Sequence, residues 1–72
     1  MTLKELRKSR GYKNQYDLAE AMGISRVYMS NIEHQRYFPS SKMLKKMAML
    51  LECDVAQLYK IILYGNDNIK GE

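Results

Sequence analysis

Apolar residues recur three or four positions apart along most of the chain, a spacing that places them on one face of an α-helix. The pattern falls into five short segments, which are separated by polar residues, glycines and one proline. Helices are therefore predicted over about residues 2–11, 14–23, 25–34, 40–51 and 54–64. Almost nothing else is predicted, so the expected fold class is all-α, a compact domain of five helices.

Side chains that can cap a helix N-terminus stand at the start of each predicted helix. They are Thr2, Asn14, Ser25, Ser40 and Asp54. At Gly23, which ends the second helix, we expect the left-handed backbone that other residues tolerate poorly. The helix boundaries are thus predicted from local chemistry.

The apolar face of each predicted helix identifies the expected core. Its members are Leu3, Leu6, Leu18, Ala19, Met22, Ile24, Met29, Ile32, Leu44, Met47, Ala48, Leu51, Val55, Leu58, Tyr59 and Ile62. Cys53 lies at an apolar position between the last two helices and is interpreted as a small buried side chain rather than a redox sensor.

The second and third predicted helices meet in a corner of only a few residues, 22–25. Ala19 is small where the helices would cross and Gly23 permits a tight turn, so we expect a steep angle between them. The side chains directed outward from the third helix are Ser25, Arg26, Val27, Ser30 and Asn31. A helix presented in this way, with small, polar and cationic residues at its N-terminal end, suits a DNA major groove.

Charge is divided unevenly along the sequence. The net charge is +4; residues 1–46 hold ten Lys or Arg against four Asp or Glu, and residues 47–72 hold two against four. The positive excess of the N-terminal part is interpreted as a footprint for phosphate, with an unevenly charged surface as the alternative.

The chemistry of several other protein classes is missing from the sequence. A single cysteine excludes an intrachain disulfide, a two-cysteine zinc site and a CxxC redox site, which suits a reducing cytoplasm. With one histidine, one cysteine and no glycine-rich phosphate loop, no catalytic constellation is complete, so an enzyme is not expected. No cofactor, metal or small-molecule effector site is predicted. The apolar runs are too short for a membrane span, and a cytoplasmic protein is predicted.

Several sequence stretches in a fixed order carry a resemblance to a known family. They are LRKSRGY at 6–12, QYDLAEAMGIS at 15–25, MSNIE at 29–33, Pro39 and LKKMAMLLECDVAQL at 44–58. Together they resemble the lambda-repressor-like helix-turn-helix regulators, which include phage Cro and repressor domains and the xenobiotic-response-element (XRE) type of bacterial regulator. The resemblance covers about residues 2–60 and implies five packed helices, the third of which reads DNA.

The resemblance also implies roles for individual residues. Those expected to reach base edges are Ser25, Arg26, Val27 and Asn31, and those expected to contact phosphate are Asn14, Gln15, Tyr28, Ser30, Arg36 and Lys42. Arg26 is the candidate for bidentate contact with guanine, and Val27 for packing on a thymine methyl. Gln15 would also brace the reading helix, and Arg7 would pair with Glu33 in a structural role.

Two positions depart from the family pattern. One more residue than usual separates Gly11 from Gln15, which lengthens the turn after the first helix without moving the reading helix. Gln35 stands where the family usually has glycine, so the loop after the third helix is expected to take another path. His34 is interpreted as a surface residue of that loop, with a phosphate contact as the alternative.

The predicted function is sequence-specific binding of double-stranded DNA as a transcriptional regulator, in particular a repressor on a palindromic operator. The rival interpretation is an antitoxin or another protein-partner module on the same fold.

One helix reads few base pairs, so a homodimer is expected. Its predicted interface consists of apolar side chains that a core of this size cannot all bury: Met49, Tyr59, Ile61, Ile62, Leu63 and Tyr64. The alternative is that residues 59–64 fold back over their own core or form a short strand. The domain is expected to span 1–64, followed by a flexible tail at 65–72.

Overall fold

The computed structural model describes residues 1–65, and within them the chain forms five helices. In chain order they are α1 (Leu3–Ser9), α2 (Gln15–Met22), α3 (Arg26–Glu33), α4 (Ser41–Leu50) and α5 (Val55–Tyr64). The predicted all-α fold is thereby confirmed. The predicted tail, apart from Gly65, lies outside the described residues, and the domain boundary stays a prediction. Within residues 1–65, no helix is long and apolar enough to cross a membrane.

Local capping chemistry explains where four of the helices begin. In each, a backbone N–H in the first turn donates to the side chain of the residue that precedes the helix, at Thr2, Asn14, Ser25 and Ser40. The expected cap at Asp54 is wrong in part, because this residue precedes α5 but makes no capping hydrogen bond with its side chain. Its contribution is a negative charge near the positive end of the helix.

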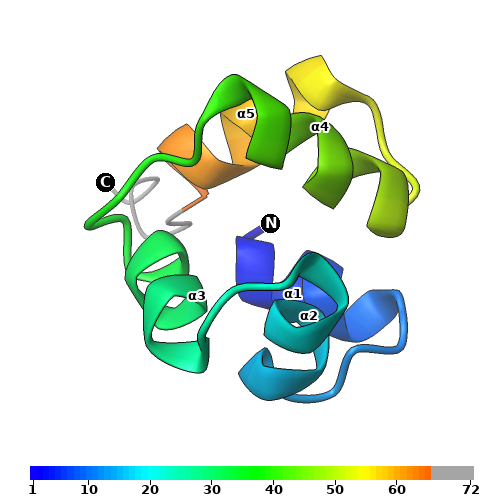
Figure 1. Cartoon of the computed structure of the whole chain (residues 1–72). Coiled ribbons are helices and arrows are strands. Elements are labelled where there is room, and N and C mark those ends of the chain that lie inside the picture. Colours follow the sequence, from blue (N-terminus) through cyan, green and yellow to red (C-terminus); the bar gives the residue numbers. More distant parts are fainter. Residues whose placement is uncertain (66–72) are drawn as a thin grey trace.

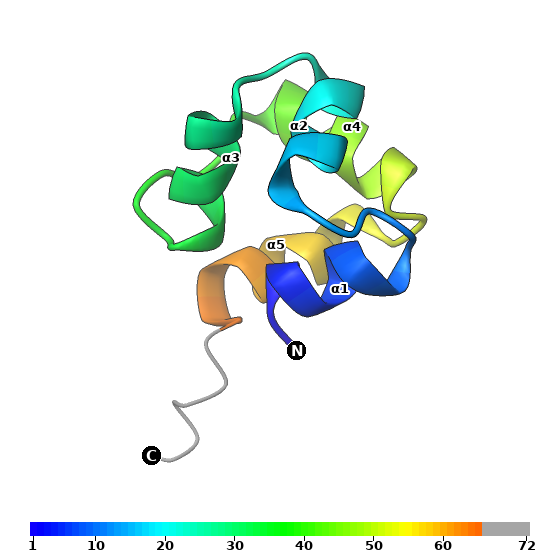
Figure 2. The ribbon, with the colours of Figure 1, turned by 90° about the horizontal axis from the view of Figure 1, so that it is seen from below.

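The core fills the space between the five helices. α2 packs against α3 and α4, and α5 packs against α4 and α1. The buried apolar side chains are Leu3, Leu6, Leu18, Ala19, Met22, Met29, Ile32, Leu44, Met47, Ala48, Leu51, Leu58 and Ile62. Figures 1 and 2 both show α3 at one edge of the assembly. The packing therefore anchors α3 by one face and leaves its opposite face open.

Three residues predicted for the core lie outside it. Val55 is 37% exposed and Tyr59 is 46% exposed, while Ile24 is half-buried against the core. α5 buries only Leu58 and Ile62, which lie four residues apart on one face. Tyr59 follows Leu58 by about 100° around the helix axis, which turns its ring away from the core. Val55 is the first residue of α5 and lies at the margin of that face.

Two further predictions need correction in the C-terminal part. Ile62 is wrong as a dimer-interface residue, because it is 3% exposed in the single chain and packs in its core. Ile61 is half-buried against the same core, so part of this segment does fold back. Cys53 is half-buried rather than buried. Burial raises the pKa of its thiol, although the positive charge of Arg10 acts to lower it.

The backbone after α3 makes the turn that a glycine would make. Gln35 has a φ of 62°, in the left-handed region, so it follows the glycine-like path rather than another one. Its Nε2 donates to the carbonyl oxygens of Ile62 at 3.0 Å and Leu63 at 3.3 Å. These carbonyls belong to the last turn of α5, where helical donors are lacking. Gln35 thereby fastens the loop after α3 to the end of α5.

Candidate nucleic-acid interface

The corner between α2 and α3 is closed by backbone hydrogen bonds. Gly23 has a φ of 75°. The N–H of Ile24 donates to the Ala19 carbonyl at 3.0 Å, and the N–H of Gly23 donates to the Glu20 carbonyl at 3.1 Å. This pair of bonds is the Schellman motif, which requires a left-handed residue at the position of Gly23. Only residues 23–25 separate the two helices, so α3 is held close to α2.

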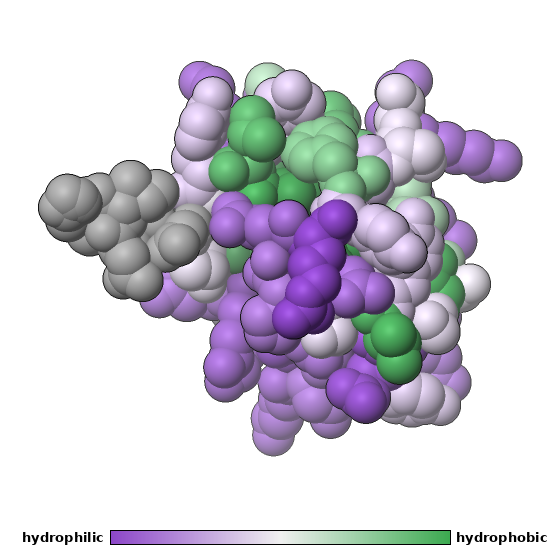
Figure 3. Space-filling model, turned by 90° about the vertical axis from the view of Figure 1, so that its left-hand side faces the viewer, coloured by the Kyte–Doolittle hydropathy of each residue, from purple (hydrophilic) through white to green (hydrophobic). Residues whose placement is uncertain are grey.

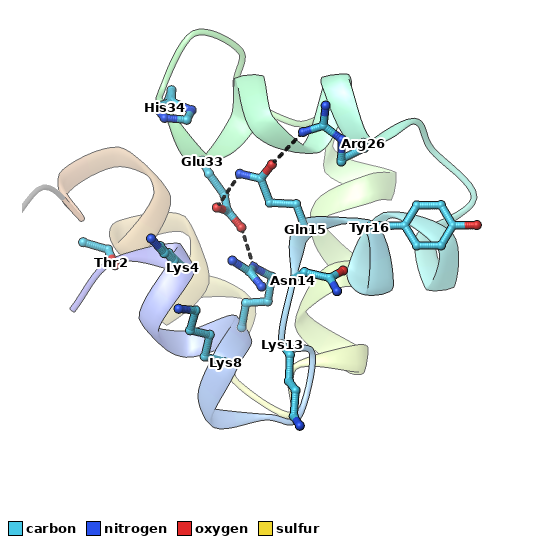
Figure 4. A pocket seen from close by; sticks show the side chains of 11 residues that line it. Thr2, Lys4, Lys8, Lys13, Asn14, Gln15, Tyr16, Arg26, Glu33 and His34 are labelled. Atoms are coloured by element: carbon cyan, nitrogen blue, oxygen red, sulfur yellow. Dashed lines mark hydrogen bonds and ion pairs between the residues drawn. The ribbon is translucent and has the colours of Figure 1, made fainter.

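A buried polar network holds the C-terminal end of α3 (Figure 4). Glu33 uses both carboxylate oxygens: Oε2 accepts from Arg7 Nε at 2.7 Å, and Oε1 accepts from Gln15 Nε2 at 3.0 Å. Arg7 also donates to the Tyr12 carbonyl at 2.8 Å. The side chains of Arg7 and Glu33 are only 2% and 5% exposed, so the ion pair is desolvated and depends on these added hydrogen bonds. The predicted pair is confirmed, and the bond from Gln15 joins the first residue of α2 to the end of α3.

The first residues of α3 present the outward face predicted from the sequence. Val27 is 62% exposed, and Arg26 lies on the surface with its Nη1 donating to Gln15 Oε1 at 3.5 Å. Ser25 is exposed, but its Oγ already accepts a bond from the Tyr28 N–H at 3.0 Å. The Ser25 hydroxyl therefore has its proton left to donate to a ligand.

The other predicted contact residues lie further along the chain. Asn31 is half-buried, and its Oδ1 accepts from Arg36 Nη1 at 3.2 Å, which places that guanidinium beside α3. Ser30 is half-buried, and its carbonyl oxygen lies 2.8 Å from His34 Nδ1, so that ring nitrogen carries the proton. Lys42 is exposed on the first turn of α4. Among residues 1–65, no group of three or more His, Cys, Asp or Glu is placed to hold a metal ion.

A hollow of about 580 Å³ opens where α1, the N-terminus of α2 and the two ends of α3 approach one another. We call it the basic hollow, and it is lined by Thr2, Lys4, Arg7, Lys8, Lys13, Asn14, Gln15, Tyr16, Arg26, Glu33 and His34. Figure 4 shows Lys4 and Lys8 on the α1 side and Asn14 and Gln15 on the α2 side. Its one carboxylate is already paired, so the remaining cations give the hollow a net positive charge.

Two of the cations in the basic hollow, both on α1, are absent from the sequence-based site. Lys4 and Lys8 lie four residues apart and are both exposed on α1. That spacing places two side chains on one face of a helix, and this was the signal that could have identified them.

A second hollow, of about 490 Å³, lies along the open side of α3. We call it the aromatic hollow, and it is lined by Ser25, Val27, Tyr28, Asn31, Tyr37 and Phe38. It contains three of the four predicted base-contacting residues, while the fourth, Arg26, lines the basic hollow with Asn14 and Gln15. Three predicted phosphate contacts line neither hollow: Ser30, Arg36 and Lys42. The predicted site residues are thus divided mainly between two neighbouring surfaces.

Comparison with known proteins gives two matches that bear on this arrangement. A family model described as "Helix-turn-helix" matches residues 3–58, which include α1 to α4 and the first turn of α5. The "ImmF control region 10 kDa protein" of Bacillus phage phi105 is 43% identical over 53 residues, which is 74% of this chain and 58% of that protein. The match therefore spans little more than half the length of that relative. No solved structure matches the chain.

Proposed function

Because the chain belongs to the helix-turn-helix family of DNA-binding regulators rather than to a family of enzymes, we propose that it regulates transcription by binding a specific double-stranded DNA sequence. We propose further that it binds a palindromic operator as a homodimer and acts as a repressor, since a bound dimer blocks access to a promoter. The phage relative is described as a control-region protein, which supports a regulatory role.

The observation that carries the proposal is the way in which α3 is presented. Its start is fixed by the Gly23 corner and its end by the Glu33 network, while Arg26 and Val27 remain exposed between them. Helix-turn-helix proteins contact base edges with the N-terminal residues of such a helix. Arg26 would donate to a guanine, and Asn31 would contact a base one turn further along.

The basic hollow supplies the electrostatic part of the proposed interface. Lys4, Lys8 and Lys13 line the same hollow as the N-terminus of α2, whose own dipole favours a negative charge there. A backbone phosphate placed beside Asn14 and Gln15 would therefore meet both the helix end and these cations. The other proposed phosphate contacts are Tyr28, Ser30, Arg36 and Lys42.

The proposed dimer would use apolar side chains that the single chain leaves exposed. Met49 is 74% exposed, Tyr64 66%, Tyr59 46% and Leu63 42%. These residues lie at the end of α4 and along α5, and none of them lines either hollow, although the ring of Tyr59 contacts Phe38 of the aromatic hollow. A symmetric pair formed through them would present two copies of α3 to half-sites about 34–36 Å apart.

The proposal is tested by selecting bound duplexes from fragmented genomic DNA and measuring affinity for the enriched sequence. Arg26→Ala should weaken binding to that sequence by about 1–3 kcal/mol and relax the preference at one base pair. Gln15→Ala should weaken binding to all sequences more evenly, because it affects phosphate contact and the support of α3. Lys46→Ala is the control matched in charge, since Lys46 is exposed on α4 and lines neither hollow.

Two results would contradict the proposal. One is a selection that enriches no common sequence. The other is an Arg26→Ala variant that binds the enriched sequence as tightly as the Lys46→Ala variant does. Circular dichroism of each variant would confirm that the helices are intact before affinities are compared.

A further inference from the structure

One stripe along the end of α4 holds a cation, an apolar side chain and a carboxylate. Lys45, Met49 and Glu52 follow one another at intervals of four and three residues, a spacing that places them on one side of the helix and its C-terminal turn. All three are exposed, and Met49 reaches 74%. Leu44 and Ala48, on the other side of α4, are buried in the core. This set, which we call the α4 stripe, therefore faces away from the rest of the chain.

The two charges of the α4 stripe have no partner in the single chain. Among residues 1–65, neither Lys45 nor Glu52 makes an ion pair or a side-chain hydrogen bond. They do not reach each other, because seven residues of helix separate them by about 10 Å along the axis. Both charges are therefore available to another molecule.

The backbone at Glu52 is strained. Its φ is 54°, in the left-handed region where a helix commonly ends on glycine. The turn is closed by the N–H of Cys53, which donates to the Ala48 carbonyl at 3.0 Å. The carboxylate also stands at the negative end of the α4 dipole, where a cation would be the favourable charge. Position 52 is thus unfavourable for glutamate in both backbone and charge.

Gln35 shows how such strain is offset within the chain. It is the other non-glycine residue with a positive φ among residues 1–65, and its side chain bonds to carbonyl oxygens of α5. The side chain of Glu52 makes no such bond. Strained residues concentrate at functional sites, so an uncompensated one points to a contact outside the chain.

Apolar surface alone does not define how a second copy of the chain would bind. Figure 3 shows the side of the molecule that lies at the left of Figure 1, and its hydrophobic areas are separated by hydrophilic side chains. Interfaces are matched in charge as well as in shape, and the charges fix the orientation of the partners. The charges of the α4 stripe are therefore a guide to the geometry of the pair.

Resting on the proposed homodimer, we propose that the α4 stripe is its two-fold contact. The two copies of α4 cross antiparallel at Met49, and Lys45 of each chain pairs with Glu52 of the other. A two-fold axis beside Met49 generates both pairs at once, because the positive end of each stripe meets the negative end of its copy. A parallel crossing would bring like charges together, so the stripe also selects the orientation of the two chains.

The test reverses one charge at a time and then mixes the variants. Lys45→Glu alone places two carboxylates opposite each other, and Glu52→Lys alone places two cations there. Each should raise the dissociation constant of the dimer at least about tenfold, since each dimer contains two such pairs. An equimolar mixture of the two variants should regain the mass of a dimer in light scattering, because every contact in the mixed pair joins opposite charges.

Lys46→Glu is the matched control for these reversals. It makes the same change of charge one residue further along, at an exposed position turned by about 100° from Lys45 around the helix. This variant should remain dimeric. Circular dichroism would confirm that the helices of each variant are intact.

Glu52→Gly separates the role in the dimer from a role in the fold. Glycine relieves the left-handed backbone and removes the carboxylate. The variant should therefore unfold at a higher temperature when dilute enough to be monomeric, yet dimerise more weakly. A residue with only a structural role would not move these two measurements in opposite directions.

Three outcomes would overturn the inference, and they are distinguishable. If the native chain is dimeric and the reversals at 45 and 52 leave it so, the α4 pairing is wrong while the proposed dimer stands. If the mixture stays monomeric although each variant is folded, the two charges do not face each other. If the native chain is monomeric, the proposed dimer fails and this contact fails with it, whereas selection of an operator tests DNA recognition separately.

Discussion

Glu33 is the residue at which α1, α2 and α3 are joined. Its two carboxylate oxygens bind Arg7 from α1 and Gln15 from α2, and Glu33 itself ends α3. The pair with Arg7 could be predicted because both partners match a family pattern across 26 positions. The contact between Phe38 and Tyr59 could not, since it depends on the course of a loop whose composition does not determine its conformation.

The burial of this ion pair leads to a prediction about stability. Arg7→Met removes the cation and leaves the Glu33 carboxylate desolvated with one hydrogen-bond donor, which should cost about 3–5 kcal/mol of unfolding free energy. The double variant Arg7→Met with Glu33→Met should be more stable than the single one, because no unpaired charge remains. Urea denaturation followed by circular dichroism would measure both. A single variant as stable as the native chain would contradict the structural role of the pair.

At the scale of helices, the sequence predicts where each helix begins and ends better than it predicts which side of the helix is buried. Caps such as Ser25 and the left-handed Gly23 act within a few residues, so their effect is visible in local sequence. Which part of an apolar stripe meets the core depends on the neighbouring helices. For that reason the sequence pattern predicts Val55 and Tyr59 in the core, whereas α5 buries only the face containing Leu58 and Ile62.

The left-handed backbone of Gln35 destabilises the fold, whereas the hydrogen bonds of its side chain stabilise it. Substitutions can separate these two effects. Gln35→Gly and Gln35→Ala both lose the bonds to the last carbonyls of α5, but only alanine keeps a Cβ at a φ of 62°. The alanine variant should therefore be the less stable of the two by about 1 kcal/mol. Thermal or urea unfolding would give the difference.

The same pair of substitutions at Gln57 provides the control. Gln57 is exposed within α5, where glycine is the worse residue by roughly 1 kcal/mol. The order of stability should therefore be reversed between the two positions. An identical order at both would show that the backbone at Gln35 is not strained.

At the scale of the whole molecule, the sequence indicates a small helical domain but leaves its assembly open. Among residues 1–65, a core of 13 buried apolar side chains accounts for the fold of one chain. The exposed apolar residues of α4 and α5 have no role in that core, so they suggest a partner without identifying the symmetry. Ile62 illustrates the difficulty, because an apolar residue suits a core and an interface equally well.

The proposed dimer predicts a change in mass on disrupting this surface. The native chain should be dimeric at tens of micromolar, and Leu63→Glu combined with Tyr64→Glu should be monomeric, because charges in an apolar interface lose their hydration. Light scattering would measure both masses. Ala21→Glu is the control, since Ala21 is exposed on α2. A monomeric native chain, or a variant that remains dimeric, would contradict the proposed interface.

The Glu33 network separates the side chains that support α3 from those that it exposes. Val27 takes no part in the network, and Arg26 adds only one long bond, at 3.5 Å to Gln15. Substitution at these two exposed positions should therefore change the preferred DNA sequence at little cost in folding free energy. A lineage of such proteins can then diverge in target sequence while Arg7, Gln15 and Glu33 are retained. Selection can therefore change the DNA sequence that α3 recognises without changing the contacts that hold α3 in the fold.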